Sequence, residues 1–213
     1  MLVSAIIPAY NEASTIGNVL EVLKNTSEVN EIIVVSDGSE DQTAQVARKY
    51  HVNVIELKEN IGKGGAMKVG VEKAIGDMIL FLDADLMGLT QQHINHLLYP
   101  VLQGRTKMTI GVFDGGRLST DLAQKISPFL SGQRALKKEI LSNLSNMEVS
   151  KFGIEVALTN YVKIHEIPYK KVVLSEITHR MKEEKLGFKK GVQARMKMYW
   201  DIVRSFAAVK DSE

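Results

Sequence analysis

The sequence contains no cysteine, which excludes a disulfide-stapled fold, a thiolate metal site and a cysteine nucleophile. It also lacks any apolar run approaching the roughly 18 residues that a membrane-spanning helix needs. The first residues, MLVSAIIPAYNE, have no basic segment and break their apolar run at Pro8, so we expect no signal peptide. Neither sign of charge predominates. The net charge is +2, which gives no overall indication of nucleic acid binding. We therefore expect a cytoplasmic protein.

The length and composition are ordinary for a globular protein. The 213 residues are 45% hydrophobic and 24% charged, which is enough for one sizeable core. The chain shows no internal repeat, no low-complexity tract and no obvious linker. We predict a single domain covering residues 1–213.

Short apolar runs alternate with helical periodicity over the first ninety residues. The apolar runs cover 2–7, 31–36, 52–57 and 78–86, and the helical patterns cover 16–23, 42–49 and 65–75. Runs that are apolar almost throughout are typical of strands buried on both faces, and helix-length spacers indicate βαβ units. The sequence therefore predicts a Rossmann-like α/β layer with a mostly parallel sheet.

The pattern is less regular after residue 86. We expect helices over 90–102, 135–142, 150–163 and 187–208, a strand over 107–112 and two short strands around Pro168. Residues 113–132 have no clear period and favour a loop-rich insertion.

Ligands of parallel α/β sheets gather beyond the carboxyl ends of the strands. The fourth apolar run, ILFLDADL, ends there in Asp83 and Asp85. Alternation along a strand would point both carboxylates to one side, where they repel unless a cation lies between them. Such oxygen ligands suit Mg²⁺ or Mn²⁺, which in turn would hold a diphosphate. A helix cap followed by a solvated acid is the simpler alternative.

The other strand ends carry polar and glycine-rich segments. The stretch NIGKGGAMKVG is neither a Walker A loop nor a dinucleotide fingerprint, but its glycines and Lys63 would suit an anion at a helix start. A flexible loop with an exposed lysine is the alternative. Asp37, at the second strand end, can accept a hydrogen bond from a base or ribose, whereas Ser39 and Asp41 also fit as helix N-caps.

Three segments in order resemble the nucleotide-sugar half of family-2-type glycosyltransferases with the GT-A fold. They are SAIIPAYNEASTIGNVL, EIIVVSDGSEDQTAQVA and NIGKGGAMKVGVEKAIGDMILFLDADL, and they cover residues 3–86 with no large gap. The weaker matches SGQRALKKEIL and KFGIEVAL follow. The resemblance implies a nucleotide-sugar half at 1–88, an acceptor-side half at 89–180 and a basic C-terminal helix at 181–213.

The resemblance also implies residue roles. The residues implied to bind the nucleotide sugar are Pro8, Ala9, Tyr10, Glu12, Asp37, Lys63, Asp83, Ala84 and Gly132. Asp83 and Asp85 would form the DxD pair that binds Mn²⁺ or Mg²⁺, with Asp85 the more direct ligand, and His179 would complete the metal site. His179 also fits as an ordinary surface histidine. Glu155 is implied as a catalytic or sugar-contacting carboxylate.

The C-terminal segment bears on the acceptor. Residues 179–210 carry nine Lys and Arg residues against three Asp and Glu, and apolar residues recur there every three or four positions. A helix packed on the core, a homodimer face and a peripheral contact with the inner face of an anionic membrane all fit this stripe. A polyprenyl phosphate or other lipid acceptor would suit the membrane contact, with Arg117 and Arg134 holding its phosphate.

These features predict a metal-dependent glycosyltransferase that moves a sugar, with a UDP-sugar as the expected donor, to an acceptor hydroxyl or phosphate. Two departures from the membrane polysaccharide synthases, the missing QxxRW sequence and the missing transmembrane tail, argue against processive synthesis. A sugar-nucleotide pyrophosphorylase is the alternative enzyme, although its glycine-arginine-rich loop after the first strand is absent. A non-catalytic nucleotide-sugar-binding protein is the alternative of another class.

Overall fold

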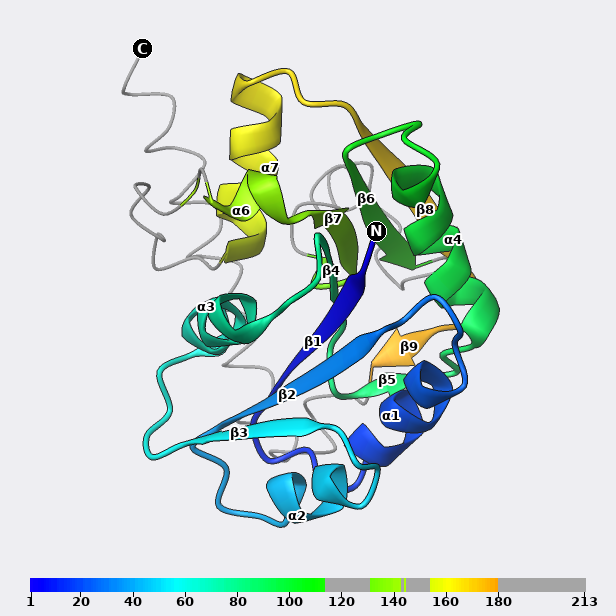
Figure 1. Ribbon diagram of the computed structural model, residues 1–213. Helices are drawn as coiled ribbons and strands as arrows, with labels where there is room; N and C mark the ends of the chain where they lie inside the picture. The colour runs from blue at the N-terminus through cyan, green and yellow to red at the C-terminus, as the bar shows by residue number, and fades with distance from the viewer. Residues whose placement is uncertain (114–130, 143, 145–153, 180–213) are drawn as a thin grey trace, which may run out of the picture.

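Strands from both halves of the chain join in one mixed sheet (Figure 1). The computed structural model describes residues 1–113, 131–142, 144 and 154–179. The sheet has seven strands in the order β3–β2–β1–β4–β7–β6–β8, and β5 pairs with β9 in a separate two-stranded ladder. The strands are β1 (Val3–Ala9), β2 (Glu31–Asp37), β3 (Asn53–Leu57), β4 (Met78–Phe81), β5 (Leu86–Met87), β6 (Met108–Phe113), β7 (Arg134–Lys137), β8 (Tyr169–Leu174) and β9 (Thr178–His179).

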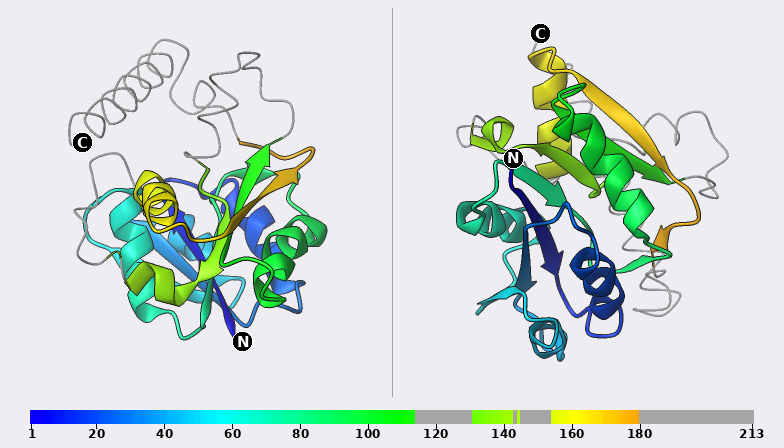
Figure 2. Two further views of the ribbon diagram at one scale, coloured as in Figure 1. Left: turned by 90° about the horizontal axis from the view of Figure 1, so that it is seen from above. Right: turned by 45° about the vertical axis from the view of Figure 1, so that its right-hand side comes forward.

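Helices cover both faces of this sheet (Figures 1 and 2). They are α1 (Ile16–Lys24), α2 (Thr43–Arg48), α3 (Lys63–Lys73), α4 (Gln91–Leu102), α6 (Lys138–Ser142) and α7 (Ile154–Ile164). One core cluster joins the sheet to α1, α2 and α4, and a second joins it to α3, α6 and α7. The alternation of a buried strand divides its side chains between the clusters, so that Leu80 faces the first and Phe81 the second.

The first four large strands are parallel, as the apolar runs predicted. Strand β1 lies between β2 and β4, and all seven of its residues are buried. The face of α1 that the periodicity predicted is the buried one, since Ile16, Val19, Leu20 and Leu23 all lie in the core.

Helix α3 begins at Lys63, two residues before the predicted start, directly after Gly62 with its positive φ of 84°. It packs closely on the sheet, because the Cα of Gly70 lies against Ile6.

Three predicted elements are wrong in part. The fourth strand ends at Phe81, and the chain turns at Ala84 and Asp85 before β5, so the two acids do not continue one strand. The helix predicted over 135–142 is a strand, β7, followed by the short helix α6, because its apolar residues fill the sheet between β4 and β6. Both late strands, β8 and β9, follow Pro168 rather than flank it.

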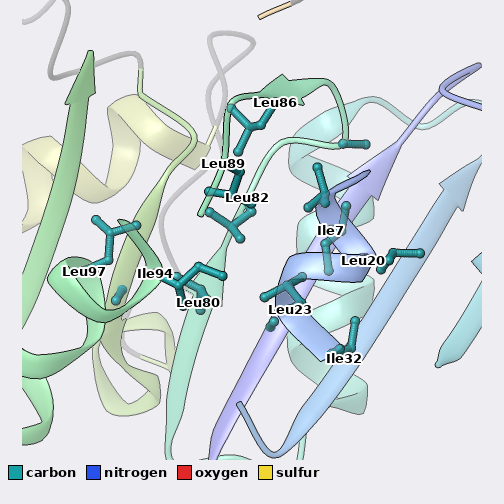
Figure 3. Close-up of a cluster of buried hydrophobic side chains, with 14 of the residues drawn as sticks. Ile7, Leu20, Leu23, Ile32, Leu80, Leu82, Leu86, Leu89, Ile94 and Leu97 are labelled. Atoms are coloured by element: carbon teal, nitrogen blue, oxygen red, sulfur yellow. The ribbon is translucent and has the colours of Figure 1, made fainter. Parts of the chain in front are cut away.

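The segment after β4 is anchored by hydrophobic packing on the α1 and α4 side (Figure 3). Leu82, Leu86 and Leu89 lie in the cluster that also contains Leu20 of α1 and Leu97 of α4. These contacts fix the course of the chain through the two acids. Strand β9 lies beside β5 on this same side (Figure 1).

Some sequence-based expectations lie outside the described residues. They are most of the expected insertion at 113–132, the predicted helix at 187–208 with its basic stripe, and Arg117. Among the residues that the structure describes, no helix is both long enough and apolar enough to cross a bilayer.

Candidate functional site

Asp83 lies just beyond the carboxyl end of β4, on the α3 and α7 side of the sheet. Its neighbours Leu82 and Ala84 are buried in the opposite cluster, next to α1 and α4. The alternation of β4 therefore persists for a few residues beyond its last ladder hydrogen bond. As a result the carboxylate of Asp83 faces the first residues of two helices.

Lys63 connects Asp83 to Glu155. Its Nζ lies 2.6 Å from Asp83 Oδ1 and 2.8 Å from Glu155 Oε1. Lys63 is the first residue of α3, and Glu155 lies in the first turn of α7. The side chains of Asp83 and Glu155 keep 17% and 10% of their surface exposed, whereas that of Lys63 keeps 40%. One ammonium thus joins residues that are distant in sequence at the edge where the resemblance predicted a site.

The two carboxylates set the charge state of Lys63. Burial by itself lowers the pKa of a lysine, but the attraction of Asp83 and Glu155 and their hydrogen bonds outweigh it. The pKa of Lys63 is therefore raised above its ordinary value. Lys63 remains a cation across the physiological pH range, although solvent at its exposed part screens the pairing.

Gly132 lies directly against this ion pair. A Cβ built on Gly132 would lie 2.5 Å from Asp83 Oδ1 and 2.5 Å from Lys63 Nζ. A side chain at this position would displace one or both groups. This contact gives a physical reason for glycine at 132 and brings the second half of the chain to the tip of β4.

Gln133 belongs to the same cluster, and the sequence analysis missed it. Its Nε2 donates to Asp83 Oδ2 at 2.8 Å, while its Oε1 accepts from the Ser131 hydroxyl at 3.0 Å. Gln133 has no exposed surface. Both oxygens of Asp83 therefore accept hydrogen bonds from protein donors, one from Lys63 and one from Gln133.

Arg134 is fully buried behind Glu155. Its Nε donates to the Ser131 carbonyl at 2.9 Å, and its side chain has no exposed surface. Burial lowers the pKa of Arg134 to about 10, and the charge of Glu155 acts in the opposite direction. Arg134 does not reach the surface in this arrangement, so it lies apart from any ligand at the edge and instead faces Glu155 from inside.

The predicted nucleoside-side residues lie at the ends of β1 and β2. Pro8 and Ala9 are buried in β1, and Tyr10 directly after them is 46% exposed. Asp37 is 3% exposed, and its Oδ1 accepts the backbone N–H of Ile61 at 2.8 Å. Asp37 therefore fixes the loop that leads into α3. Its second oxygen has no donor among the described residues.

Polar contacts join the loops after β1 and β2. Asn11 Oδ1 accepts the N–H of Glu40 at 2.8 Å, and Asp41 Oδ2 accepts that of Ala13 at 3.0 Å. The N-cap of α2 is Gln42, whose side chain makes no capping hydrogen bond, so the expected N-cap at Ser39 or Asp41 is not confirmed. Asp41 Oδ1 nevertheless accepts the N–H of Thr43, the first residue of α2, at 2.9 Å. Burial alone would raise the pKa of Asp41, but these hydrogen bonds and one from the Thr43 hydroxyl hold it below its ordinary range.

Glu12 lies at the start of α1, where its Oε2 accepts the Thr15 hydroxyl at 3.0 Å. Its backbone N–H donates to the Thr43 hydroxyl at 2.8 Å, which adds a further link between the loops after β1 and β2.

Asp85 lies in the turn between β4 and β5, and β9 runs beside it. The backbone of His179 pairs with Leu86, the residue that follows Asp85. Ala84 is 3% exposed and packs in the core, so a ligand would meet its backbone rather than its side chain. The described residues contain no group of three acidic or histidine side chains that would hold a metal ion by themselves.

The donor set of this turn fits a hard divalent cation. Carboxylate oxygens are the ligands that Mg²⁺ and Mn²⁺ prefer, and imidazole is compatible with Mn²⁺. Lys63 and Gln133 already engage both oxygens of Asp83, so an ion there would share these oxygens with the two donors or replace one of them. Asp85 carries the other carboxylate of this turn, and the side chain of His179, the third expected ligand, lies outside the part of the chain that the structure describes.

Comparison with known proteins agrees with this architecture. The family model described as Glycosyl transferase family 2 matches residues 4–162. The uncharacterized protein MJ1222 of Methanocaldococcus jannaschii is 31% identical over 216 residues, which covers 86% of this chain and 87% of that protein. The dolichyl-phosphate beta-glucosyltransferase of Mus musculus is 41% identical over 98 residues, but this match covers 38% of this chain and only 30% of the mouse enzyme.

Solved structures give the same result for the fold. The glucosyl-3-phosphoglycerate synthase of Mycobacterium tuberculosis, in complex with Mn²⁺, UDP-glucose and phosphoglyceric acid, superimposes with a TM-score of 0.71 at 25% identity. The superposition covers 84% of this chain and 71% of that one. The predicted fold class, a GT-A sheet flanked by helices, is confirmed.

Proposed function

The chain belongs to glycosyl transferase family 2, and on that premise we propose that it transfers a sugar from a UDP-sugar to an acceptor hydroxyl or phosphate. The observation that carries the proposal is the meeting of Lys63, Asp83 and Gly132 at the carboxyl edge of the sheet. Relatives add support, because the mycobacterial synthase has been solved with UDP-glucose and Mn²⁺, and with UDP and Mg²⁺. A lipid phosphate acceptor is compatible with the mouse relative, which by its name glucosylates dolichyl phosphate.

On this proposal, the uridine lies over the ends of β1 and β2. The imide N–H of uracil would donate to Asp37, while Tyr10, 46% exposed, would cover the ring. Glu12 and the linked loops after β1 and β2 would hold the rim of this pocket. The diphosphate would then extend toward the start of α3.

Lys63 would meet the diphosphate at the amino end of α3, where backbone N–H groups also favour an anion. Asp83 and Glu155 hold its ammonium between them, at 2.6 and 2.8 Å. A cation fixed beforehand stabilises charge that develops on a leaving group without reorganising during the reaction. Mn²⁺ or Mg²⁺, held by Asp85 and His179 and to a lesser degree by Asp83, would supply Lewis-acid stabilisation of the same leaving group.

Glu155 is our candidate for the carboxylate that contacts the transferred sugar or accepts the acceptor proton. Because Lys63 contacts Oε1 of Glu155, the oxygen that would make this contact is Oε2. A phosphate acceptor is already an anion near neutral pH and would need no such base. Arg134 then serves to balance the charge of Glu155 from inside the fold.

The test is calorimetric titration of UDP with and without Mn²⁺, on the wild type and on Asp85→Asn. We expect binding that depends on Mn²⁺ and is abolished by the substitution. Asp77→Asn is the matched control, because Asp77 is an exposed carboxylate at the opposite end of the same strand, beside the N–H of Leu2. It should leave binding unchanged.

UDP binding that depends on neither Mn²⁺ nor Asp85 would overturn the assignment of the site. If UDP does not bind, a repeat with GDP would show whether the protein uses a nucleotide with another base. Metal-dependent UDP binding with no transfer from any donor in a panel of UDP-sugars would favour the non-catalytic alternative.

A further inference from the structure

Asn60 lies in the loop that leads from β3 to α3 (Figure 1). It is an exposed residue, yet both ends of its side-chain amide bond backbone groups. Its Nδ2 donates to the carbonyl of Asp37 at 3.1 Å, and its Oδ1 accepts the N–H of Gly62 at 3.1 Å. Asp37 is the last residue of β2, and Gly62 directly precedes α3. One side chain therefore links the end of β2 to the start of α3.

Asp37 reinforces this link from the opposite direction. Its Oδ1 accepts the backbone N–H of Ile61 at 2.8 Å, and the residue is 3% exposed. Asn60 and Asp37 thus each use a side chain to bond the backbone of the other's segment. Gly38 permits this close approach, because a Cβ on it would lie 2.5 Å from the backbone nitrogen of Asn60. The loops after β2 and β3 are in backbone contact and cannot shift far past each other.

The start of α3 depends on these contacts. Gly62 is the N-cap, with a φ of 84°, and no side chain makes a capping hydrogen bond there. The first N–H groups of a helix have no partner within the helix. Asn60 accepts the N–H of Gly62, just ahead of those groups, and so fixes the start of α3 without occupying the first turn. Lys63 follows directly as the first residue of the helix.

We propose that Asn60 is a positioning residue, which holds Lys63 and the start of α3 at a fixed distance from Asp37. This inference rests on the proposed function, in which Asp37 reads the uracil and Lys63 meets the diphosphate. The base and the diphosphate of one nucleotide are then bound by a single rigid unit. A start of α3 that had to be ordered when the nucleotide binds would lower the affinity by the cost of that ordering.

The test compares Asn60→Ala with Asn25→Ala. Asn25 is also an exposed asparagine whose Nδ2 donates to a backbone carbonyl, that of Glu21 at 2.8 Å, but it lies at the far end of α1 from the site. With Mg²⁺ present, we expect Asn60→Ala to bind UDP about tenfold more weakly, as for the loss of two neutral hydrogen bonds. Calorimetric titration measures this affinity, and Asn25→Ala should leave it unchanged.

Uridine is the second ligand in this test, because it has no phosphate to meet Lys63. Asp37 stays paired with Leu57 in the ladder of β2 and β3 when Asn60 is replaced. We therefore expect uridine, titrated by NMR, to bind Asn60→Ala within about twofold of the wild type, well below the loss for UDP. A role confined to general stability would weaken the binding of both ligands alike.

A double-mutant cycle with Lys63→Met shows whether Asn60 acts through Lys63. Once Lys63 is replaced, the further change Asn60→Ala should weaken UDP binding by only about twofold. An undiminished loss in the Lys63→Met background would mean that Asn60 acts on the nucleotide by another route, and would overturn the proposal. If Asn60→Ala does not fold, Asn60→Ser replaces it, since a serine hydroxyl can still accept the N–H of Gly62 but is too short to reach Asp37.

Hydrogen exchange in the ligand-free protein tests the positioning role without any nucleotide. We expect the amides of Ile61 and Ala66 to exchange about fivefold faster in Asn60→Ala, because Ile61 bonds Asp37 and Ala66 makes the first helical bond, to Gly62 at 3.0 Å. Wild-type exchange at both amides, or wild-type affinity for UDP, would overturn the proposal. If the wild type itself binds no UDP, the proposed function fails. The exchange rates then decide the positioning role, since faster exchange supports it and equal exchange rejects it.

Discussion

At the residue scale, Gly132 decides how closely the second half of the chain can approach the ion pair of Lys63 and Asp83. In Gly132→Ala the new Cβ would lie 2.5 Å from both charged groups, so one of them must move. We expect turnover to fall about 100-fold, the loss typical of a misplacement near 1 Å at a reacting centre. The measurement is steady-state transfer from a UDP-sugar, with circular dichroism to show that the fold persists.

Gly104→Ala is a useful comparison for this variant. Gly104 has a positive φ of 69° and open space around it, so alanine there costs about 1–2 kcal/mol of backbone strain. We expect lower stability with unchanged turnover, the reverse of Gly132→Ala. Equal turnover in Gly132→Ala and the wild type would mean that the pair has room to shift.

Which site residues the sequence could predict depends on the kind of signal that each carries. Asp83 follows an apolar strand and Lys63 begins a helix after a glycine. Both positions can therefore be recognised from the order of residues along the chain. Gln133 is polar and uncharged, and its role is defined only by a hydrogen bond to a residue 50 positions away. Its one local signal is its place beside Gly132. The burial of Arg134 was equally hidden, because arginine in an irregular segment is usually solvated.

At the scale of elements, α3 positions Lys63, and its distance from the sheet is set by Gly70. Alanine is favoured over glycine inside a helix by about 1 kcal/mol, which taken alone predicts that Gly70→Ala stabilises the protein. The added Cβ, however, would collide with Cγ2 of Ile6 on β1. We expect the collision to dominate and to lower the free energy of unfolding by about 1–3 kcal/mol, measured by urea denaturation.

The double variant Gly70→Ala with Ile6→Leu makes this test specific, because leucine has no methyl group on Cβ at the colliding position. Recovery of stability beyond the sum of the single effects would locate the cost at this contact. A single variant Gly70→Ala that is more stable than the wild type would show that α3 moves away from the sheet at little cost.

The sequence predicted an element correctly where the element's own residues carry a clear pattern. It failed where the conformation of a segment depends on the strands that pair with it. The periodicity of 16–23 belongs to α1 alone, and the helix was found with its buried face correct. The residues of β7 are strand only because β4 and β6 leave a gap that they fill, and their local pattern resembles a helix. Likewise β4 ends at Phe81 because the chain must turn toward β9, a partner more than ninety residues away.

At the scale of the whole molecule, the two halves that the resemblance distinguished, 1–88 and 89–180, share a single sheet and both core clusters. Strand β4 pairs with β7 along its full length, from Met78 with Lys137 to Phe81 with Arg134. Each cluster combines residues from both halves, as Ile6 with Leu158 on the α3 side and Ile7 with Leu97 on the α4 side. Neither half can bury its apolar surface without the other.

We therefore expect the full chain to unfold in one cooperative transition, with coincident curves from circular dichroism and tyrosine fluorescence and with equal calorimetric and van't Hoff enthalpies. A fragment of residues 1–88 should not fold, because β4 would become an open edge and Phe81 and Leu80 would lose the partners that cover them. The control is the full chain under the same conditions. Two separate transitions, or a fragment 1–88 with a cooperative unfolding curve, would show that the donor-side half is a domain in its own right. In that case the bridge from Lys63 to Glu155 would join two folding units rather than two parts of one core.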